Sequence, residues 1–120
     1  MNVLISDDSA VMRKMIARSL RQTGLEVAVS GEAGNGVEGL SFLADNTIDL
    51  VLCDWNMPEM NGLDFVKELR KSNKTPVVML TTESAREKIV EAMEAGADGY
   101  LTKPFTPESL AEKLSLILGL

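Results

Sequence analysis

The sequence contains no histidine, a single cysteine, one tryptophan, one tyrosine and three phenylalanines. The absence of histidine excludes Ser-His-Asp and Cys-His nucleophile pairs and every metal site that needs an imidazole. Cys53 has no partner for an internal disulfide, and a lone thiol in an apolar run is typical of a buried side chain in a reducing compartment. Any chemistry must therefore come from carboxylates, hydroxyls and lysines.

Long apolar runs and an excess of positive charge are also absent. No run approaches the roughly 20 residues that span a bilayer, and no basic segment precedes an apolar one at the N-terminus, so we expect a cytoplasmic protein without a membrane partner. Twelve basic and eighteen acidic residues give a net charge of −6, which opposes contacts with nucleic-acid phosphates. A length of 120 residues predicts one domain, residues 1–120, that binds no nucleic acid by itself.

Short apolar runs alternate along the chain with longer segments whose apolar residues repeat at helical spacing. Strands are expected at residues 2–6, 25–30, 48–53, 76–81 and 99–102. The apolar stripes of three intervening helices comprise Val11, Met12, Met15, Ile16 and Leu20, then Ile89, Val90 and Met93, then Leu110, Leu114 and Ile117. Most of the strands show little polar alternation, which predicts a parallel sheet covered on both faces.

Helix starts are also visible in the sequence. Asn35 with Glu38 and Ser84 with Glu87 fit the capping box, and Thr106 before a proline fits an N-cap. Five strands and five helices with right-handed crossovers predict an α/β fold, a (βα)5 doubly wound five-stranded parallel sheet. In such folds functional groups lie beyond the carboxyl ends of the strands.

Polar side chains follow four of the predicted strands at that edge. They are Asp7 and Asp8 after the first strand, Asp54 after the third, Thr81 and Thr82 at the end of the fourth, and Lys103 after the fifth. Three carboxylates gathered in one place would repel one another unless a cation neutralised them. Oxygen ligands completed by water suit Mg²⁺ better than Ca²⁺, so the sequence predicts a Mg²⁺ site.

Each of these residues taken alone has a simpler interpretation. Asp7 and Asp8 could cap the next helix, because Asp is favoured at N-caps. Asp54 and Thr81 suit turns, and Lys103 alone is typical of a solvated charge. The coincidence of suitable groups at four strand ends favours metal-assisted phosphoryl transfer over these separate interpretations.

Four segments connect these residues to a known family. They read VLISDDS, LVLCDWNMPEMNGLDF, VVMLTTES and GADGYLTKPFTPESL. Over nearly its full length the chain resembles the response-regulator receiver domains, and among them the stand-alone receivers of chemotaxis. The resemblance implies a flavodoxin-like sheet in the order 2-1-3-4-5 and a role as a two-component phosphorelay receiver, not a conventional enzyme.

The resemblance also implies a set of Mg²⁺ ligands. Asp54 would be the phosphoryl acceptor, and Asp8 and Asp54 would bind the metal directly. Asp7 would hold the metal through water, and Asn56 would contribute its backbone carbonyl. A carboxylate close to the metal can attack phosphorus in line, which suits Asp54 as the nucleophile.

Further roles follow from the same resemblance. Thr81 would donate a hydrogen bond to a phosphoryl oxygen, and Lys103 would pair with the phosphoryl charge. Asn56 and Glu83 would modulate the lifetime of the phosphoryl group. Thr81 and Tyr100 would act together as the conformational switch. The Lys103-Pro104 peptide bond is expected to be cis, which suits an X-Pro bond in a tight turn.

The resemblance implies partners as well. The phosphodonor would be a histidine kinase, and the reader would be a flagellar motor switch protein or a phosphatase, with the chain itself a monomer. A receiver module of a longer regulator, with a DNA-binding or enzymatic output domain, stays open as the alternative. A flavin carrier is disfavoured because Asp7 and Asp8 would repel its phosphate, and a dehalogenase-type phosphatase needs a second acid where this chain has Asn56.

Overall fold

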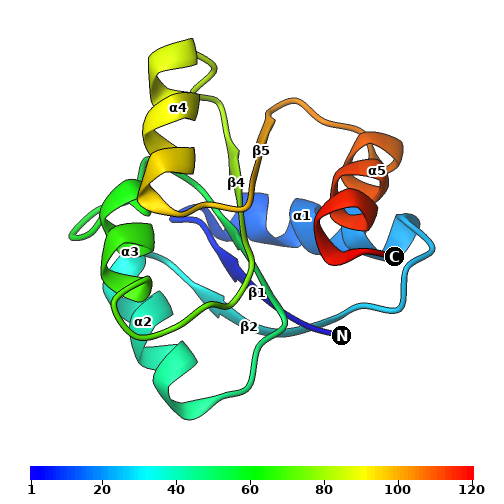
Figure 1. The fold of residues 1–120 in the computed structure, drawn as a ribbon. Coiled ribbons are helices and arrows are strands. Elements are labelled where there is room, and N and C mark those ends of the chain that lie inside the picture. Colours follow the sequence, from blue (N-terminus) through cyan, green and yellow to red (C-terminus); the bar gives the residue numbers. More distant parts are fainter.

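The computed structural model describes all residues from 1 to 120 and contains five strands and five helices in strict alternation (Figure 1). Their bounds are β1 Asn2–Ser6, α1 Ala10–Gln22, β2 Ala28–Ala33, α2 Gly36–Asp45, β3 Leu50–Cys53, α3 Gly62–Leu69, β4 Val77–Thr81, α4 Arg86–Ala95, β5 Gly99–Thr102 and α5 Pro107–Leu118. No helix combines the length and the apolar character that crossing a membrane requires.

The strands form one parallel sheet in the order β2-β1-β3-β4-β5, which confirms the predicted architecture and strand order. Helices α1 and α5 cover one face, and α2, α3 and α4 cover the other (Figure 1). Every residue of β3 and β4 is buried, because these central strands have a helical layer on both sides. Two apolar clusters fill the spaces between the sheet and its two helical layers.

The prediction for the second strand was wrong by three residues, since β2 spans Ala28–Ala33 and not 25–30. β2 lies at the sheet edge, and its exposure alternates instead of forming a continuous buried run. Its position is set by pairing with β1, where Asn2 lies opposite Ala28 and Ser6 opposite Ala33. The strands expected at 48–53 and 76–81 begin two residues and one residue later, respectively.

The apolar stripe expected on α1 was also partly wrong. Ile16 is buried, but Val11 is 69% exposed and Met15 is 56% exposed. A helix turns by about 100° per residue, so Met15 lies about 100° and Val11 about 140° away from the direction of Ile16. Only the narrower face around Ile16 and Leu20 reaches the sheet and α5.

The predicted helix starts had three different outcomes. Thr106 caps α5 as expected, in a capping box completed by Ser109. Asn35 caps α2, but the Glu38 carboxylate accepts from the Gly34 amide instead of the Asn35 amide, so the expected box is only half formed. Helix α4 begins differently from the prediction.

The expected capping box of Ser84 with Glu87 is absent. The N-cap of α4 is Ala85, which makes no side-chain capping bond. The chain just before it is held by other bonds, because the Glu83 amide donates to the Thr81 hydroxyl and the Glu83 carbonyl accepts from Tyr100. These bonds keep the segment after β4 out of the helix and delay its start.

Candidate functional site

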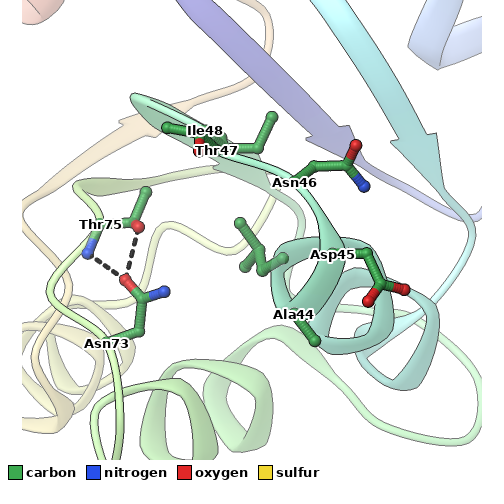
Figure 2. Close-up of a pocket in the computed structure, with 8 residues that line it drawn as sticks. Ala44, Asp45, Asn46, Thr47, Ile48, Asn73 and Thr75 are labelled. Atoms are coloured by element: carbon green, nitrogen blue, oxygen red, sulfur yellow. Dashed lines mark hydrogen bonds between the residues drawn. The ribbon is translucent and has the colours of Figure 1, made fainter.

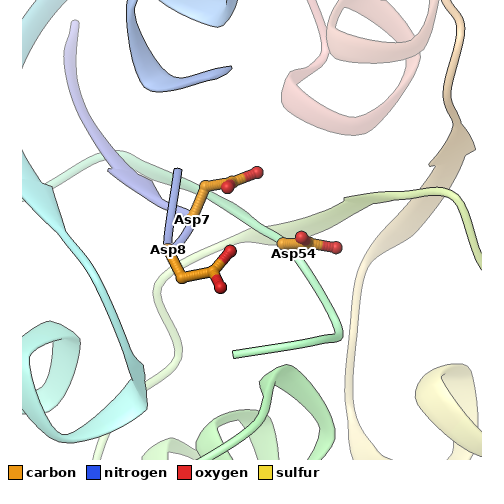
Figure 3. Close-up of side chains that lie close together, drawn as sticks. All are labelled: Asp7, Asp8 and Asp54. Carbon is orange, nitrogen blue, oxygen red and sulfur yellow. The ribbon is translucent and has the colours of Figure 1, made fainter. Parts of the chain in front are cut away.

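Three carboxylates meet at the carboxyl edge of the sheet, those of Asp7, Asp8 and Asp54 (Figure 3). Ser6 and Cys53 lie opposite each other in the paired strands β1 and β3, so the residues that follow them emerge side by side. One oxygen from each carboxylate lies within 4.8 Å of the others. Asp7 is buried, Asp54 is half-buried and Asp8 is exposed. An all-oxygen donor set with one solvent-facing member fits Mg²⁺, which keeps several water ligands.

Lys103, the residue that follows β5, lies against this cluster. Its Nζ is 2.8 Å from an Asp7 oxygen and 3.6 Å from an Asp54 oxygen, and its side chain is 10% exposed. Three carboxylates and one ammonium leave two negative charges (three minus one), which a single divalent cation balances. The structure therefore groups the three acids and the lysine that the sequence pointed to.

Both the main chain and the side chain of Asp54 are held by hydrogen bonds to neighbouring backbone groups. Its amide donates to the Ser6 carbonyl at 2.9 Å, and its Oδ1 accepts from the Trp55 amide at 2.7 Å. The buried Trp55 ring carries the Lys88 ammonium 4.8 Å from its centroid, a contact that ties α4 to the acidic site. Oδ2 is left to face Lys103 and the space above the sheet.

The other predicted residues form a second group that hydrogen bonds connect. The amide of Glu83 donates to Thr81 Oγ1 at 3.3 Å, and Asn56 Nδ2 donates to Glu83 Oε1 at 3.1 Å. The Tyr100 hydroxyl donates to the Glu83 carbonyl. Glu83 thus connects Asn56, Thr81 and Tyr100 through hydrogen bonds.

Two further predicted features lie outside this group. The Lys103-Pro104 peptide bond is cis. Thr82, the residue after β4, is exposed and lines a groove together with Met12, Met15 and Phe105, which Lys103 also borders. Thr82 therefore stands apart from the hydrogen bonds around Glu83.

Cys53 precedes Asp54 but is unsuited to act as a nucleophile. Its thiol is fully buried, and burial, reinforced by the negative charge of Asp54, raises its pKa far above the usual range. A thiol that stays protonated and inaccessible is chemically inert. Asp54 is the group next to it that solvent can reach.

The ionisation of the Tyr100 hydroxyl should reveal a raised pKa in an alkaline titration. Burial raises the pKa from 10.0 to about 12, and the negative charges of Glu83 and Asp54 add to the effect. Tyr100 is the only tyrosine, so tyrosinate absorbance should rise near pH 12 in the folded chain and about two units lower in denaturant. Because the raised pKa favours the neutral folded form, this contribution to stability should disappear as pH rises from 10 to 12. Titration of the folded chain near pH 10 would contradict a hydroxyl held against Glu83.

Gly62, the first residue of α3, is predicted to be essential for the shape of the site. A Cβ at this position would overlap the backbone carbonyl oxygen of Asp54. The Gly62 amide also donates to the backbone carbonyl of Trp55 at 2.8 Å, which fixes the position of Gly62. Gly62→Ala should lower the free energy of unfolding by about 1 to 3 kcal/mol, because backbone must move. Urea denaturation checks this loss. Gly34→Ala is the control, because a Cβ at that position would lie 3.5 Å from its nearest neighbour, a side-chain oxygen of Glu38. Equal losses in both variants would contradict the clash.

Two residues that the sequence pattern did not indicate, Arg13 and Glu32, border the acidic cluster. Arg13, the fourth residue of α1, donates to the Asp7 carbonyl and to the Glu32 carboxylate. Glu32 lies near the carboxyl end of β2, the one strand for which no functional group was predicted. A search for charged residues at all five strand ends would have found Glu32.

A separate hollow lies at the opposite edge of the sheet, before β3 and β4 (Figure 2). It is lined by Leu43, Ala44, Asp45, Asn46, Thr47, Ile48, Asn73 and Thr75. The amide and hydroxyl of Thr75 both donate to the Asn73 side chain, so these polar groups already satisfy one another. None of the residues predicted from the sequence to take part in chemistry lines this hollow.

A parallel sheet with acidic groups at its carboxyl edge, beside a lysine and a threonine from neighbouring strands, is the architecture of a phosphorelay signalling domain. The family model described as "Response regulator receiver domain" matches residues 3–115, and the chain belongs to this family. The resemblance noted from the four sequence segments is therefore confirmed. Receiver domains generally bind Mg²⁺ in an acidic pocket, and they are signalling proteins.

The particular relatives are chemotaxis proteins. The chain is 45% identical to the chemotaxis protein CheY1 of Helicobacter pylori strain J99, an alignment that covers 99% of this chain and 98% of the relative. It is 42% identical to the chemotaxis protein CheY-3 of Vibrio cholerae, covering 98% and 91% of the two chains. Among solved structures, the chemotaxis protein CheY4 of Vibrio cholerae is 40% identical with a TM-score of 0.81, covering 97% of each chain.

Proposed function

We propose that this receiver takes a phosphoryl group from a histidine kinase onto Asp54, with Mg²⁺ bound at the acidic cluster, and that it acts in chemotaxis. The observation that carries the proposal is the joint placement of Asp54, Asp7 and Asp8 with Lys103 against them. Carboxylates, an ammonium and room for a hydrated cation are what phosphoryl transfer to an aspartate needs. The high identity to chemotaxis proteins supports the chemotactic role.

In this proposal four residues hold the metal. Asp8 and Asp54 would bind it directly, Asp7 through water, and Asn56 through its backbone carbonyl. When bound, Mg²⁺ would neutralise charge on the phosphoryl oxygens. Asp7, almost completely buried and paired with Lys103, would keep the lysine pointing into the site.

Asp54 would perform the transfer itself. An oxygen of its carboxylate forms the bond to phosphorus while the donor's bond to phosphorus breaks, and the donor leaves with that electron pair. Oδ2 faces Lys103 at 3.6 Å, so the ammonium is close enough to turn from the carboxylate to the transferred phosphoryl group. The contribution of the chain is therefore positioning and charge stabilisation, which a loose transition state requires most.

Thr81 and Tyr100 would carry the signal outward. Thr81 Oγ1 accepts from the Glu83 amide, and its O–H can still donate to a phosphoryl oxygen, so a movement of Thr81 toward the phosphoryl group would pull on the bond to Glu83. Glu83 is also the acceptor for Tyr100, so a shift at Thr81 would reach Tyr100 through one residue. Asn56 and Glu83, which hydrogen-bond to each other, would control access of water to the acyl phosphate and hence its lifetime.

The proposed function also implies the partners of the chain. A histidine kinase supplies the phosphoryl group, and a flagellar motor switch protein or a phosphatase reads it, with the receiver working as a cytoplasmic monomer. The family membership supports the kinase, and the names of the relatives support a chemotactic reader.

The test is intact mass after incubation with acetyl phosphate and Mg²⁺, quenched rapidly because acyl phosphates hydrolyse. We expect the gain of one phosphoryl unit with Mg²⁺ and no gain when the metal is chelated. Trp55, the only tryptophan, adjoins Asp54 and should report Mg²⁺ binding by fluorescence in the same samples. Clear Mg²⁺ binding without any gain in mass would contradict the proposed transfer.

A further inference from the structure

Arg13 joins three segments of the chain beside the acidic cluster. Its Nε donates to Glu32 Oε1 at 2.8 Å, and its Nη1 donates to the Asp7 carbonyl oxygen at 2.6 Å. The Arg13 side chain is only 20% exposed, whereas that of Glu32 is 50% exposed. Because a guanidinium is planar and rigid, its pairing with Glu32 also fixes the direction in which it meets the carbonyl.

The carbonyl that Arg13 holds belongs to the peptide between Asp7 and Asp8. Asp7 has further supports, because its amide donates to the Ala33 carbonyl and its carboxylate accepts from Ser9 and Lys103. The Asp8 carboxylate is exposed and forms no hydrogen bond or ion pair with another part of the chain. The direction of Asp8 thus depends on its backbone, and the Arg13 bond restrains the peptide that leads into it.

We propose that Arg13 is a positioning residue for the cation site, held in place by Glu32. The inference deepens the proposed function and depends on Mg²⁺ binding there. Arg13 orients the peptide between Asp7 and Asp8, so that Asp8 presents its carboxylate beside Asp54. Groups that orient metal ligands in this way typically change metal affinity 10- to 100-fold.

Simple electrostatics predicts the opposite sign. Arg13 carries a positive charge close to three carboxylates, so by Coulomb repulsion its removal should strengthen cation binding. Positioning predicts that its removal weakens binding, because Asp8 loses its fixed direction. The sign of the change in Mg²⁺ affinity therefore separates the two roles, and a residue needed only for folding would leave the affinity unchanged.

The experiment is a titration with Mg²⁺ followed by Trp55 fluorescence, on the wild-type chain and Arg13→Gln. The matched control is Lys14→Gln, which removes the same charge from the neighbouring exposed position of α1, where no ion pair exists. We expect Arg13→Gln to bind Mg²⁺ about 10-fold more weakly than Lys14→Gln. Arg13→Lys should fall between, because lysine keeps the charge but has no rigid fork.

Glu32→Ala gives a second test at a half-exposed position. It should also weaken Mg²⁺ binding, because Arg13 loses the acceptor that aims it at the carbonyl. Affinities of Arg13→Gln and Glu32→Ala equal to or tighter than that of Lys14→Gln would overturn the positioning role while leaving the proposed function intact. No Mg²⁺ response in the wild-type chain would overturn the metal site of the proposed function, and the inference with it.

Discussion

Replacing Asp54 with asparagine is expected to abolish the Mg²⁺-dependent gain of a phosphoryl group from acetyl phosphate. An amide is a far poorer nucleophile than a carboxylate, and the neighbouring Cys53 thiol is buried and protonated, so it offers no substitute. The phosphoryl gain of Asp54→Asn, measured by intact mass after rapid quenching, should fall to the level of the metal-free control.

The substitution should leave the fold intact. Asp54 Oδ1 accepts from the Trp55 amide at 2.7 Å, and an asparagine oxygen can accept the same bond. Removing one of three neighbouring carboxylates also relieves repulsion. Loss of phosphorylation can then be assigned to the acceptor itself.

Asp8→Asn is the matched control for this variant. It removes a proposed metal ligand but keeps the Asp54 nucleophile, so phosphorylation should become slower and recover at higher Mg²⁺ concentration. Recovery at high Mg²⁺ in Asp54→Asn, or a phosphoryl gain equal to the wild type, would show that another residue is the acceptor.

The central part of the fold could be predicted from the sequence because its strands are buried on both faces. Such strands appear as continuous apolar runs, and β3 and β4 were located to within one or two residues at their starts. The edge strand β2 was predicted three residues too early, because half of its residues face solvent and its register comes from pairing with β1. Long-range pairing of this kind leaves no local signal in a single sequence.

The site residues at the strand ends were predictable for a similar reason. In a parallel sheet all carboxyl ends meet at one edge, so Asp7, Asp54 and Lys103 had to approach one another once the topology was known. The contacts of Arg13 were not predictable, because they depend on the reach of a long side chain from the start of α1 to Glu32. On sequence alone Arg13 resembles the other basic residues of an exposed helix.

Lys103→Met is expected to destabilise the metal-free chain by about 3 to 5 kcal/mol, the usual cost of removing one partner from a buried ion pair. Asp7 is 2% exposed and has Lys103 as its only ion-pair partner, at 2.8 Å. Without the ammonium, Asp7 would keep a buried charge beside two further carboxylates. The free energy of unfolding in urea, measured without Mg²⁺, checks this loss.

The control is Lys71→Met, which breaks an exposed pair with Glu68 and should change stability by at most about 0.5 kcal/mol. Equal stability of Lys103→Met and Lys71→Met without Mg²⁺ would contradict the structural role assigned to the buried pair.

Adding Mg²⁺ should narrow the difference between Lys103→Met and the wild-type chain. The ammonium and the metal neutralise the same carboxylates, so removal of the ammonium should strengthen Mg²⁺ binding to the folded state, and a ligand that binds only the folded state raises its stability. Phosphorylation should not recover in parallel, because the transferred phosphoryl group would lack the charge of Lys103. A variant whose stability returns with Mg²⁺ while its phosphoryl gain stays low would separate the two roles of this lysine: neutralising the acidic cluster and stabilising the phosphoryl group.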